Sequence, residues 1–135
     1  MKVKRIAIVT GATGGLGREF VHLLLKEKNV DEIWALARNE KKLGRLKEKF
    51  GQKVKIYSID LSSVRQIQCF EKELKQEAQR RKLEISYLIN NAGFAKFCSY
   101  GDLSIEESLN MIHVNIDAVV AMGLVCIPYM KKGSH

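Results

Sequence analysis

The sequence predicts an α/β fold, a doubly wound parallel sheet with helices on both faces. Two observations lead to it. Short apolar runs alternate four times with segments whose apolar residues recur at helical spacing, which is the pattern of parallel strands joined by right-handed crossover helices. The first run, residues 6–9, leads into a turn crowded with glycine between positions 11 and 17. In such a sheet the first four strands take the order 3-2-1-4, and ligands bind at their carboxyl ends.

The glycine-rich turn follows the first expected strand. It reads T-G-A-T-G-G-L-G from Thr10 to Gly17, and helix-forming sequence continues from Arg18. Glycine permits positive φ angles and close approach of a ligand to the backbone. The N-terminus of a helix offers unpaired N–H groups and the positive end of its dipole to an anion. We therefore expect a nucleotide pyrophosphate here, although the spacing is not G-x-G-x-x-G; a tight turn without ligand is the alternative.

The next elements follow in order. The buried face of the first helix is expected at residues with helical spacing, which are Leu16, Phe20, Leu23 and Leu24. Residues 33–37 form a continuous apolar run, typical of a strand buried on both faces of a parallel sheet. Asn39 is expected to cap a basic second helix over residues 40–50.

The third and fourth units repeat this plan. A third strand is predicted over residues 54–59, closing at Asp60. Ser63 and Gln66 have the spacing of a capping box in front of a long third helix. Its buried stripe is expected at Val64, Ile67, Phe70, Leu74 and Ala78. A fourth strand is predicted over residues 85–89, after which Ser104 and Glu107 cap a helical segment that continues to residue 130.

Composition excludes several classes of protein. With 46% hydrophobic residues the chain is too apolar to be disordered. The net charge of +8 comes from basic residues mixed with Glu over several helices, which disfavours a nucleic-acid partner. The apolar stretch 118–127 is about half a membrane span, so no membrane is expected. The three cysteines form no C-x-x-C and the histidines share no ligand spacing, which argues against a metal site and favours a reducing cytoplasm.

Polar or glycine-rich residues follow each of the four strands, so one extended ligand could contact all of them. A site that selects NAD places Asp or Glu about 20 residues beyond the glycines. This sequence has Ala37 and then Arg38 there. A guanidinium can bind a ribose 2′-phosphate, so NADP(H) is favoured over NAD(H). A solvated loop charge is the alternative for Arg38.

The other two strand ends leave alternatives open. Asp60 can accept from the amino group of adenine or cap the next segment. Asn90 and Asn91 can contact a ligand or tie their turn to neighbouring backbone, and for Asn90 the structural role is at least as well supported.

Together these motifs resemble those of the short-chain dehydrogenases/reductases, in register over all 135 residues. Thr10 to Gly17 resembles the family's cofactor motif, and it also fits the extended branch. Asp60-Leu61 resembles the adenine-contacting pair, and the N-N-A-G run 90–93 resembles the strand-four motif of the shorter branch. The resemblance implies a Rossmann-type fold. It also implies cofactor contacts at Gly11, Thr13, Gly15, Leu16, Gly17, Arg38, Asp60, Leu61, Asn91, Ala92 and Gly93.

The resemblance further implies individual roles. Gly11 forms the turn, Thr13 and Leu16 contact phosphate or ribose, and residues 91–93 line the ribose beside nicotinamide. Asn115 resembles the catalytic Asn that orders a water for proton relay; from the residues alone it is a polar interruption of an apolar helix. Many NADPH-preferring members carry Lys or Arg inside the glycine loop, where this sequence has Gly14.

The family's remaining catalytic residues, a Ser and a Tyr-x-x-x-Lys pair, have no counterpart here, since no Tyr is followed four residues later by Lys. We expect residues 1–135 to be one incomplete NAD(P)-binding domain, cut before a fifth strand. It would be the cofactor half of an NADPH-dependent oxidoreductase of small carbonyls or alcohols, with no turnover of its own. A non-catalytic NADP(H)- or partner-binding module is the alternative. Self-association is expected through the strand-four edge or the last helix.

Overall fold

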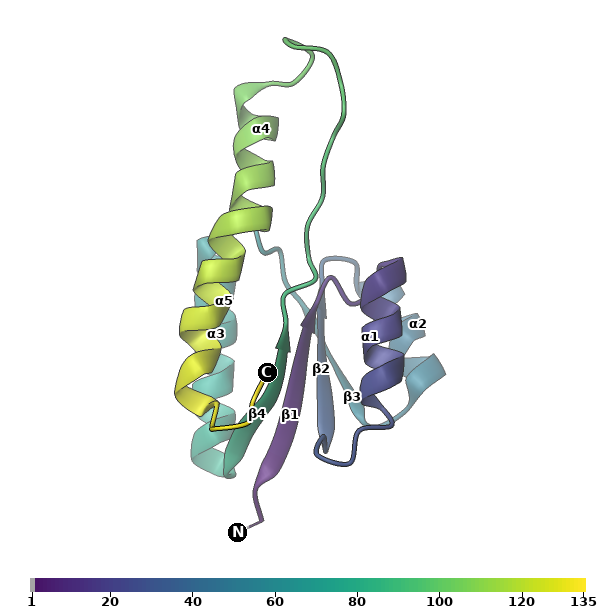
Figure 1. Cartoon of the computed structure of the whole chain (residues 1–135), viewed down its shortest axis with the longest axis vertical. Helices are drawn as coiled ribbons and strands as arrows, with labels where there is room; N and C mark the ends of the chain where they lie inside the picture. Colours follow the sequence, from purple (N-terminus) through teal and green to yellow (C-terminus); the bar gives the residue numbers. More distant parts are fainter. Residues whose placement is uncertain (1) are drawn as a thin grey trace.

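The computed structural model describes residues 2–135, and its centre is one four-stranded parallel sheet (Figure 1). The strands are β1 (Lys4–Thr10), β2 (Glu32–Ala37), β3 (Val54–Ser58) and β4 (Leu83–Ile89). They lie in the order β3-β2-β1-β4, and every neighbouring pair is parallel. The predicted fold class and strand order are therefore confirmed.

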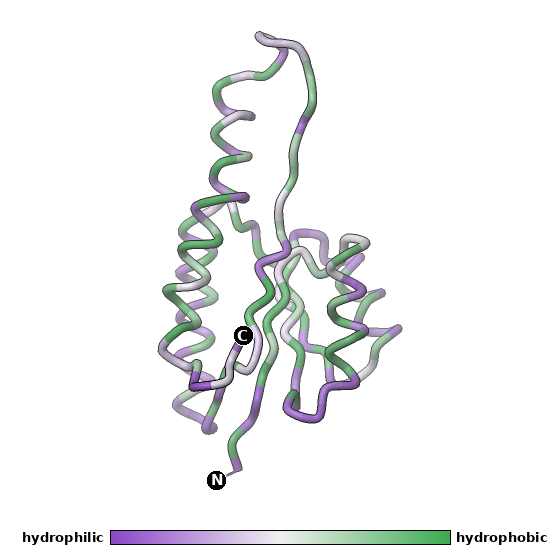
Figure 2. The backbone as a smooth tube through the Cα atoms, in the orientation of Figure 1, coloured by the Kyte–Doolittle hydropathy of each residue, from purple (hydrophilic) through white to green (hydrophobic). Residues whose placement is uncertain are grey.

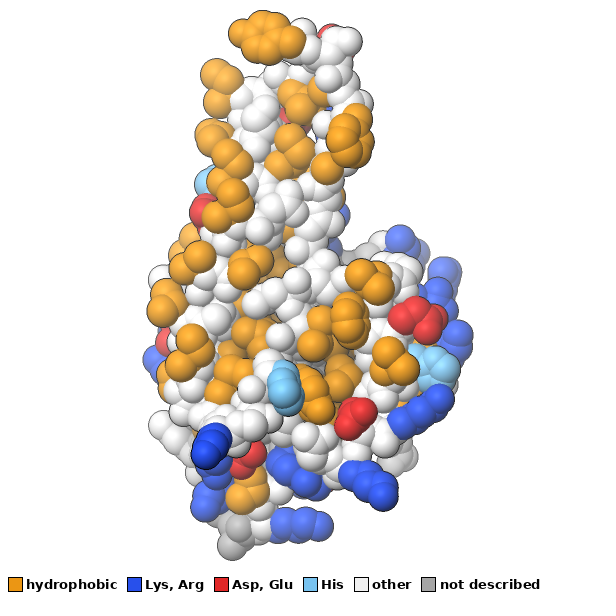
Figure 3. Space-filling view, in the orientation of Figure 1, with side chains coloured by type: hydrophobic (Ala, Val, Ile, Leu, Met, Phe, Trp, Pro, Cys, Tyr) orange, Lys and Arg blue, Asp and Glu red, His pale blue; other side chains and the backbone are white. Residues whose placement is uncertain are grey.

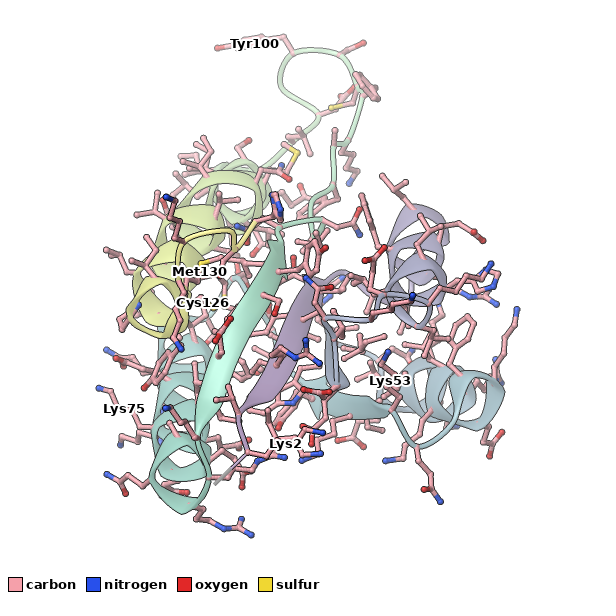
Figure 4. The ribbon with its side chains drawn as sticks, turned by 60° about the horizontal axis from the view of Figure 1, so that its bottom comes forward. Lys2, Lys53, Lys75, Tyr100, Cys126 and Met130 are labelled. Atoms are coloured by element: carbon pink, nitrogen blue, oxygen red, sulfur yellow. The ribbon has the colours of Figure 1, made fainter. Side chains whose placement is uncertain are left out.

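Helices cover both faces of the sheet (Figure 1). On one face lie α1 (Gly15–Leu24) and α2 (Glu40–Phe50), and on the other lie α3 (Val64–Arg80) and α5 (Ala118–Cys126). A further helix, α4 (Ile105–Ile112), joins α5 through a π-helical turn, His113–Asp117, and a short 3-10 turn follows at Ile127–Tyr129. The segment from β4 to α4 extends beyond the sheet, with Tyr100 at its tip (Figure 4).

Alternating side chains on the strands make two apolar layers, one on each face of the sheet. The hydrophobic residues of these strands are coloured green in the middle of Figure 2. Ile6 and Ile8 of β1 pack with β2, α3 and α5. Ala7 and Val9, on the opposite face of the same strand, pack with α1 and α2. All four are fully buried. Burial on both faces makes each central strand read as an unbroken apolar run.

The first helix differs from the prediction. It begins at Gly15 rather than Arg18, and its buried face is Gly17, Val21 and Leu24. Leu16 and Leu23 are 66% and 59% exposed, so the predicted stripe is wrong at these two positions. Helical spacing is compatible with either the predicted face or the observed one. Gly17 has no side chain and lets α1 pack closely on the glycine turn, so the face with Gly17, Val21 and Leu24 is the buried one. In α3 the buried residues are Ile67, Phe70 and Leu74, but Val64 is 64% exposed.

The predicted caps form, with one departure. Asn39 accepts from the Lys42 amide at 3.0 Å, and Ser104 and Glu107 make both bonds of a capping box. Ser63 accepts from the Gln66 amide at 3.3 Å, as predicted. The side chain of Gln66, however, accepts from the amide of Asp60 at 2.7 Å and completes no box with Ser63.

The edge of β4 is partly covered by the end of the chain. The His135 amide donates to the Ser86 carbonyl at 2.9 Å, and the Leu88 amide donates to the His135 carbonyl at 2.8 Å. The ring of His135 stacks on Tyr87 at 5.5 Å. The strand-four edge, through which self-association was expected, is therefore not open along its whole length, because the segment after α5 turns back and pairs with the middle of β4.

The helical segment Ile105–Tyr129 is longer than the apolar stretch considered in the sequence. Its 25 residues contain an 18-residue window with a mean hydropathy of 1.8, which is enough to cross a membrane by length and composition. This is weak evidence, because core helices pass the same test. Only 28% of its most apolar window is buried. Ala118, Met122, Val125 and Cys126 are nevertheless buried against the sheet and α3, so this helix also belongs to the packed layer.

Candidate functional site

A pocket of about 360 Å³ lies at the carboxyl ends of the four strands. All of the predicted cofactor-binding residues line it, from the glycine turn, Arg38, the third strand end and the 91–93 run. The pocket is completed by Gly14, Ala37, Ile59, Phe94 and Val114. Of these, Phe94 and Val114 were not predicted from the sequence. Phe94 directly follows Gly93 and Val114 directly precedes Asn115, and this adjacency to predicted residues is the sequence feature that could have indicated them.

Two glycines of the turn are required by close packing. Gly11 has φ +60°, and a Cβ on it would lie 2.9 Å from the Cα of Ala92. A Cβ on Gly17 would meet the carbonyl oxygen of Gly11 at 2.0 Å. Any side chain at either position would therefore push α1 or the 91–93 run away from the turn.

Gly15 has a different environment. A Cβ on Gly15 would have no heavy atom within 4 Å, and the residue lines the pocket. Packing within the protein therefore does not require glycine at this position. The absence of a side chain instead leaves space for a ligand in the pocket. This is the position at which a ligand can approach the first turn of α1 closely.

The N-terminus of α1 is available to an anion. Its cap residue, Gly14, is extended and offers no side-chain cap, and its first turn contains no acidic residue. The first N–H groups of a helix have no partner inside the helix. Together with the helix dipole they form a site for a phosphate group.

The turn is held against the end of β4 by two side chains. The Oγ1 atom of Thr10, which is buried, accepts from the Ala92 amide at 2.9 Å. The Nδ2 atom of Asn91 donates to the Gly11 carbonyl at 3.1 Å. A structural bond to neighbouring backbone was one of two alternatives for Asn90 and Asn91, and it is Asn91 that makes such a bond, while Asn90 is exposed. These bonds join two walls of the pocket.

Arg38 and Asp60 lie at the other end of the pocket. The Oγ atom of Ser58 donates to the Arg38 carbonyl at 3.0 Å and so anchors its backbone. Among the described residues the guanidinium of Arg38 makes no hydrogen bond or ion pair, and it is exposed. Hydrogen bonds from Ser62, helped by the charge of Arg38, hold the pKa of Asp60 below its usual range although burial opposes this. A free cation and an ionised carboxylate therefore face this end of the pocket.

Asn115 lies in the π-helical turn next to the pocket, where its neighbour Val114 is exposed to the ligand space. Its Oδ1 accepts from the Phe94 amide at 2.9 Å, and its Nδ2 donates to the Phe94 carbonyl at 2.6 Å. A Cβ on Gly93 would lie 2.5 Å from Asn115 Oδ1. The side chain of Asn115 therefore fastens the segment after β4 to the helix. Its role in proton relay stays a prediction.

Comparison with known proteins gives a consistent result. The family model for short chain dehydrogenase matches residues 5–135. The NADPH-dependent 1-acyldihydroxyacetone phosphate reductase of Saccharomyces cerevisiae is 35% identical over 106 residues, which cover 78% of this chain and 34% of the reductase. A benzil reductase of Bacillus cereus is 26% identical over 130 residues, covering 95% of this chain and 51% of that protein.

Solved structures share the fold. The NADPH-bound carbonyl reductase from chicken fatty liver superposes with a TM-score of 0.76 at 21% identity, over 96% of this chain and 52% of that one. The closed form of serine dehydrogenase complexed with NADP⁺ superposes with a TM-score of 0.75 at 27% identity, over 91% and 48%. The chain thus spans about half the length of such relatives. With its parallel sheet, glycine turn and matched sequence, the chain belongs to the short-chain dehydrogenase family.

Proposed function

We propose that this chain binds NADP(H) in the pocket at the carboxyl ends of its strands, as the cofactor-binding half of an oxidoreductase of small carbonyls or alcohols. The observation that carries the proposal is the convergence of the predicted residues on one pocket. These residues come from four separate strand ends. A dinucleotide is long enough to need all of them.

The residues fit the parts of the cofactor in order. The free N-terminus of α1 and the open side of Gly15 would take the pyrophosphate. The unpaired guanidinium of Arg38 would take the 2′-phosphate, because charge-assisted bonds to phosphate are strong. Asp60 and Leu61 would border the adenine. The run from Asn91 to Gly93 would line the ribose of the nicotinamide, which supplies the hydride when the cofactor is bound.

We further propose that the chain has no carbonyl reductase turnover by itself. Carbonyl reduction needs a proton donor with a tuned pKa beside the hydride donor. The family's Tyr-x-x-x-Lys pair is missing, since Leu61, Asn91, Ser104 and Gly133 stand four residues after the four tyrosines. A non-catalytic NADP(H)- or partner-binding module is the second candidate, because the same pocket would serve it.

The relatives support the cofactor and the reaction class. The yeast relative is named as an NADPH-dependent reductase, and the Bacillus cereus relative as a reductase of benzil, a carbonyl compound. The serine dehydrogenase structure holds NADP⁺. We also propose a cytoplasmic location, which the three free cysteines support.

Titration of the intrinsic fluorescence of NADPH tests the binding proposal directly. The 135-residue chain is expected to bind NADPH saturably and to bind NADH at least about tenfold more weakly, which corresponds to about 1.4 kcal/mol. No oxidation of NADPH is expected when a ketone is added. Absence of saturable binding would refute the proposed function. Reductase activity of the isolated chain would refute the absence of turnover alone.

We also propose that the chain self-associates through the outer face of the helical segment Ile105–Tyr129. Apolar side chains gather along this helix in Figure 3. The exposed ones recur mostly every three or four residues and are Ile105, Leu109, Ile112, Ile116, Val119, Val120, Leu124 and Ile127. A continuous apolar stripe of this kind suits packing against the same helix of a second copy. The β4 edge is less suitable, because His135 already pairs with it.

A further inference from the structure

A second hollow, of about 300 Å³, lies beside the strand-end pocket and shares Arg38 and Phe94 with it. The rest of its lining comes from the segment after β4 and from α4, which run side by side at the end of the molecule in Figure 1. A volume of this size lies at the lower end of the range for small-molecule sites. The proposed position of NADP(H) uses Arg38 but leaves the rest of this hollow without a ligand.

Arg38 reaches the second hollow with its side chain, because neither of its chain neighbours, Ala37 and Asn39, lines that hollow. The guanidinium has no hydrogen bond or ion pair among the described residues, and the residue is exposed. Since Arg38 also lines the strand-end pocket, its charge is available to an anion in either place.

The other two charged residues of the hollow, Lys96 and Glu107, neutralise each other. The Nζ atom of Lys96 donates to Glu107 Oε1 at 2.9 Å, and the Ser104 amide donates to Glu107 Oε2 at 2.9 Å. These hydrogen bonds lower the pKa of Glu107 to about 2 from 4.5, so the carboxylate is ionised at neutral pH. Two cations and one carboxylate leave the lining with a single positive charge, which suits an anion that carries one negative charge.

The uncharged part of the lining is mostly apolar. Phe94, Leu103 and Met111 are apolar, and Asn110 adds one amide group that can donate to an oxygen atom of a ligand. Small-molecule sites typically combine such apolar walls with a few polar groups that fix the orientation of the ligand. A matching ligand therefore has a hydrocarbon part for the apolar wall and a carboxylate for Arg38.

We propose that the second hollow binds a small amphipathic monocarboxylate through Arg38, and that this ligand selectively weakens the binding of NADPH; the second part rests on the proposed binding of NADP(H). A carboxylate bound to the guanidinium would occupy donors that the 2′-phosphate needs, and the two anions would repel each other. The coupling is reciprocal, so NADPH would weaken binding of the carboxylate by the same factor. NADH has no 2′-phosphate and would be affected much less.

Calorimetric titration of the 135-residue chain with octanoate, below the concentration at which it forms micelles, tests the site without any cofactor. Saturable binding is expected with a dissociation constant of about 1 mM or below, and 1-octanol, which lacks the charge, is expected to bind about tenfold more weakly. Arg38→Leu should weaken octanoate about tenfold. Arg45→Leu, exposed on α2, is the matched control and should bind octanoate like the parent.

The effect on the cofactors is measured by fluorescence titration with and without saturating octanoate. The affinity for NADPH is expected to fall about fivefold or more, and that for NADH less than about twofold. Met111→Gln changes the apolar wall at a residue that does not line the strand-end pocket. It should weaken octanoate about threefold and leave binding of NADPH alone unchanged. Leu109→Gln, exposed on the same helix and outside the hollow, should change neither.

The outcomes separate this site from the proposed function. Absence of octanoate binding, or equal binding of 1-octanol, overturns the site. Equal weakening of NADPH and NADH by octanoate overturns it as well, because the ligand would then occupy the strand-end pocket itself. If the parent binds octanoate but not NADPH, the proposed function and the coupling are refuted, while the carboxylate site stands.

Discussion

The side-chain amide of Asn91 donates to the carbonyl oxygen of Gly11 at 3.1 Å, across the ends of two adjacent strands. This bond fixes the glycine turn relative to the run that is proposed to line the nicotinamide ribose. Asn91→Ala is expected to destabilise the protein by about 1 kcal/mol and to weaken NADPH binding about tenfold, since a wall of the pocket loses its tether. Thermal unfolding and fluorescence titration measure the two effects. Asn90→Ala, at an exposed neighbour, should change neither.

Arg38 is expected to determine the preference between cofactors. Its guanidinium has no partner among the described residues, so a 2′-phosphate would gain charge-assisted bonds there without breaking others. Arg38→Asp is expected to reduce the ratio of NADPH to NADH affinity about 10- to 100-fold, which corresponds to about 1.5–3 kcal/mol. Arg45→Asp, exposed on α2, carries the same charge change and should leave the ratio nearly intact. An unchanged ratio in Arg38→Asp would mean that Arg38 is a solvated loop charge.

Alanine substitutions at Gly15 and Gly17 are expected to have different effects. Only at Gly17 would the added Cβ clash with the protein itself, whereas at Gly15 it would occupy space that the ligand needs. Gly17→Ala would place a Cβ 2.0 Å from the Gly11 carbonyl oxygen and should destabilise the fold by about 2 kcal/mol or more. Gly15→Ala meets nothing within 4 Å, so it should fold normally but weaken NADPH binding. Gly44→Ala in α2 also meets nothing and should stabilise the protein by about 0.5–1 kcal/mol with unchanged binding. Full NADPH affinity in Gly15→Ala would contradict close approach of the ligand.

Glu32 is expected to make stability depend on acid pH. Burial alone would raise the pKa of Glu32, but hydrogen bonds from Arg81 and Trp34 and the charge of Lys55 outweigh it and lower the pKa to about 2 from 4.5. A carboxylate with a lowered pKa stabilises the fold above its unfolded pKa and loses this contribution as the pH falls through the folded pKa. The parent should therefore lose stability between about pH 5 and pH 2.

Glu32→Gln tests this dependence. The variant should be less stable at pH 7 by about 3 kcal/mol, because Arg81 loses the carboxylate that accepts two of its hydrogen bonds. Its denaturation midpoint should change less than that of the parent between pH 5 and pH 2. Glu27→Gln, at an exposed position, serves as control and should follow the parent curve. Parallel pH curves for Glu32→Gln and the parent would contradict the assignment.

Self-association through the Ile105–Tyr129 helix predicts a dimer or larger species in light scattering at micromolar concentration. Ile116 and Leu124 are 57% and 71% exposed on this helix. The double variant Ile116→Glu/Leu124→Glu is expected to be monomeric, because charges cannot be buried in an apolar contact. Leu23→Glu, 59% exposed on α1, should keep the oligomeric state of the parent. A monodisperse monomer of the parent chain would refute this surface as an interface.

The sequence by itself determined the order of the elements, the parallel sheet and the four strand ends that meet at the pocket. These follow from local signals: the unbroken apolar runs of buried strands, the glycine turn, and caps such as Asn39 and Ser104. Parallel strands place their carboxyl ends at one edge of the sheet, so residues that follow the strands must converge there whatever the packing details. The family resemblance added the identities of the residues around the cofactor.

Only the tertiary structure decided which face of a helix is buried where the spacing of its apolar residues allows more than one. Spacing allows Leu16 and Leu23 or Val21 and Leu24 to face the sheet, and the approach of Gly17 to Gly11 selects the second pair. The same holds for contacts between residues far apart in the chain. Thr10 and Ala92 are 82 positions apart, and the edge of β4 meets His135 only after α5 has crossed the sheet. Local periodicity carries no information about such partners, because they meet only when the whole sheet has assembled.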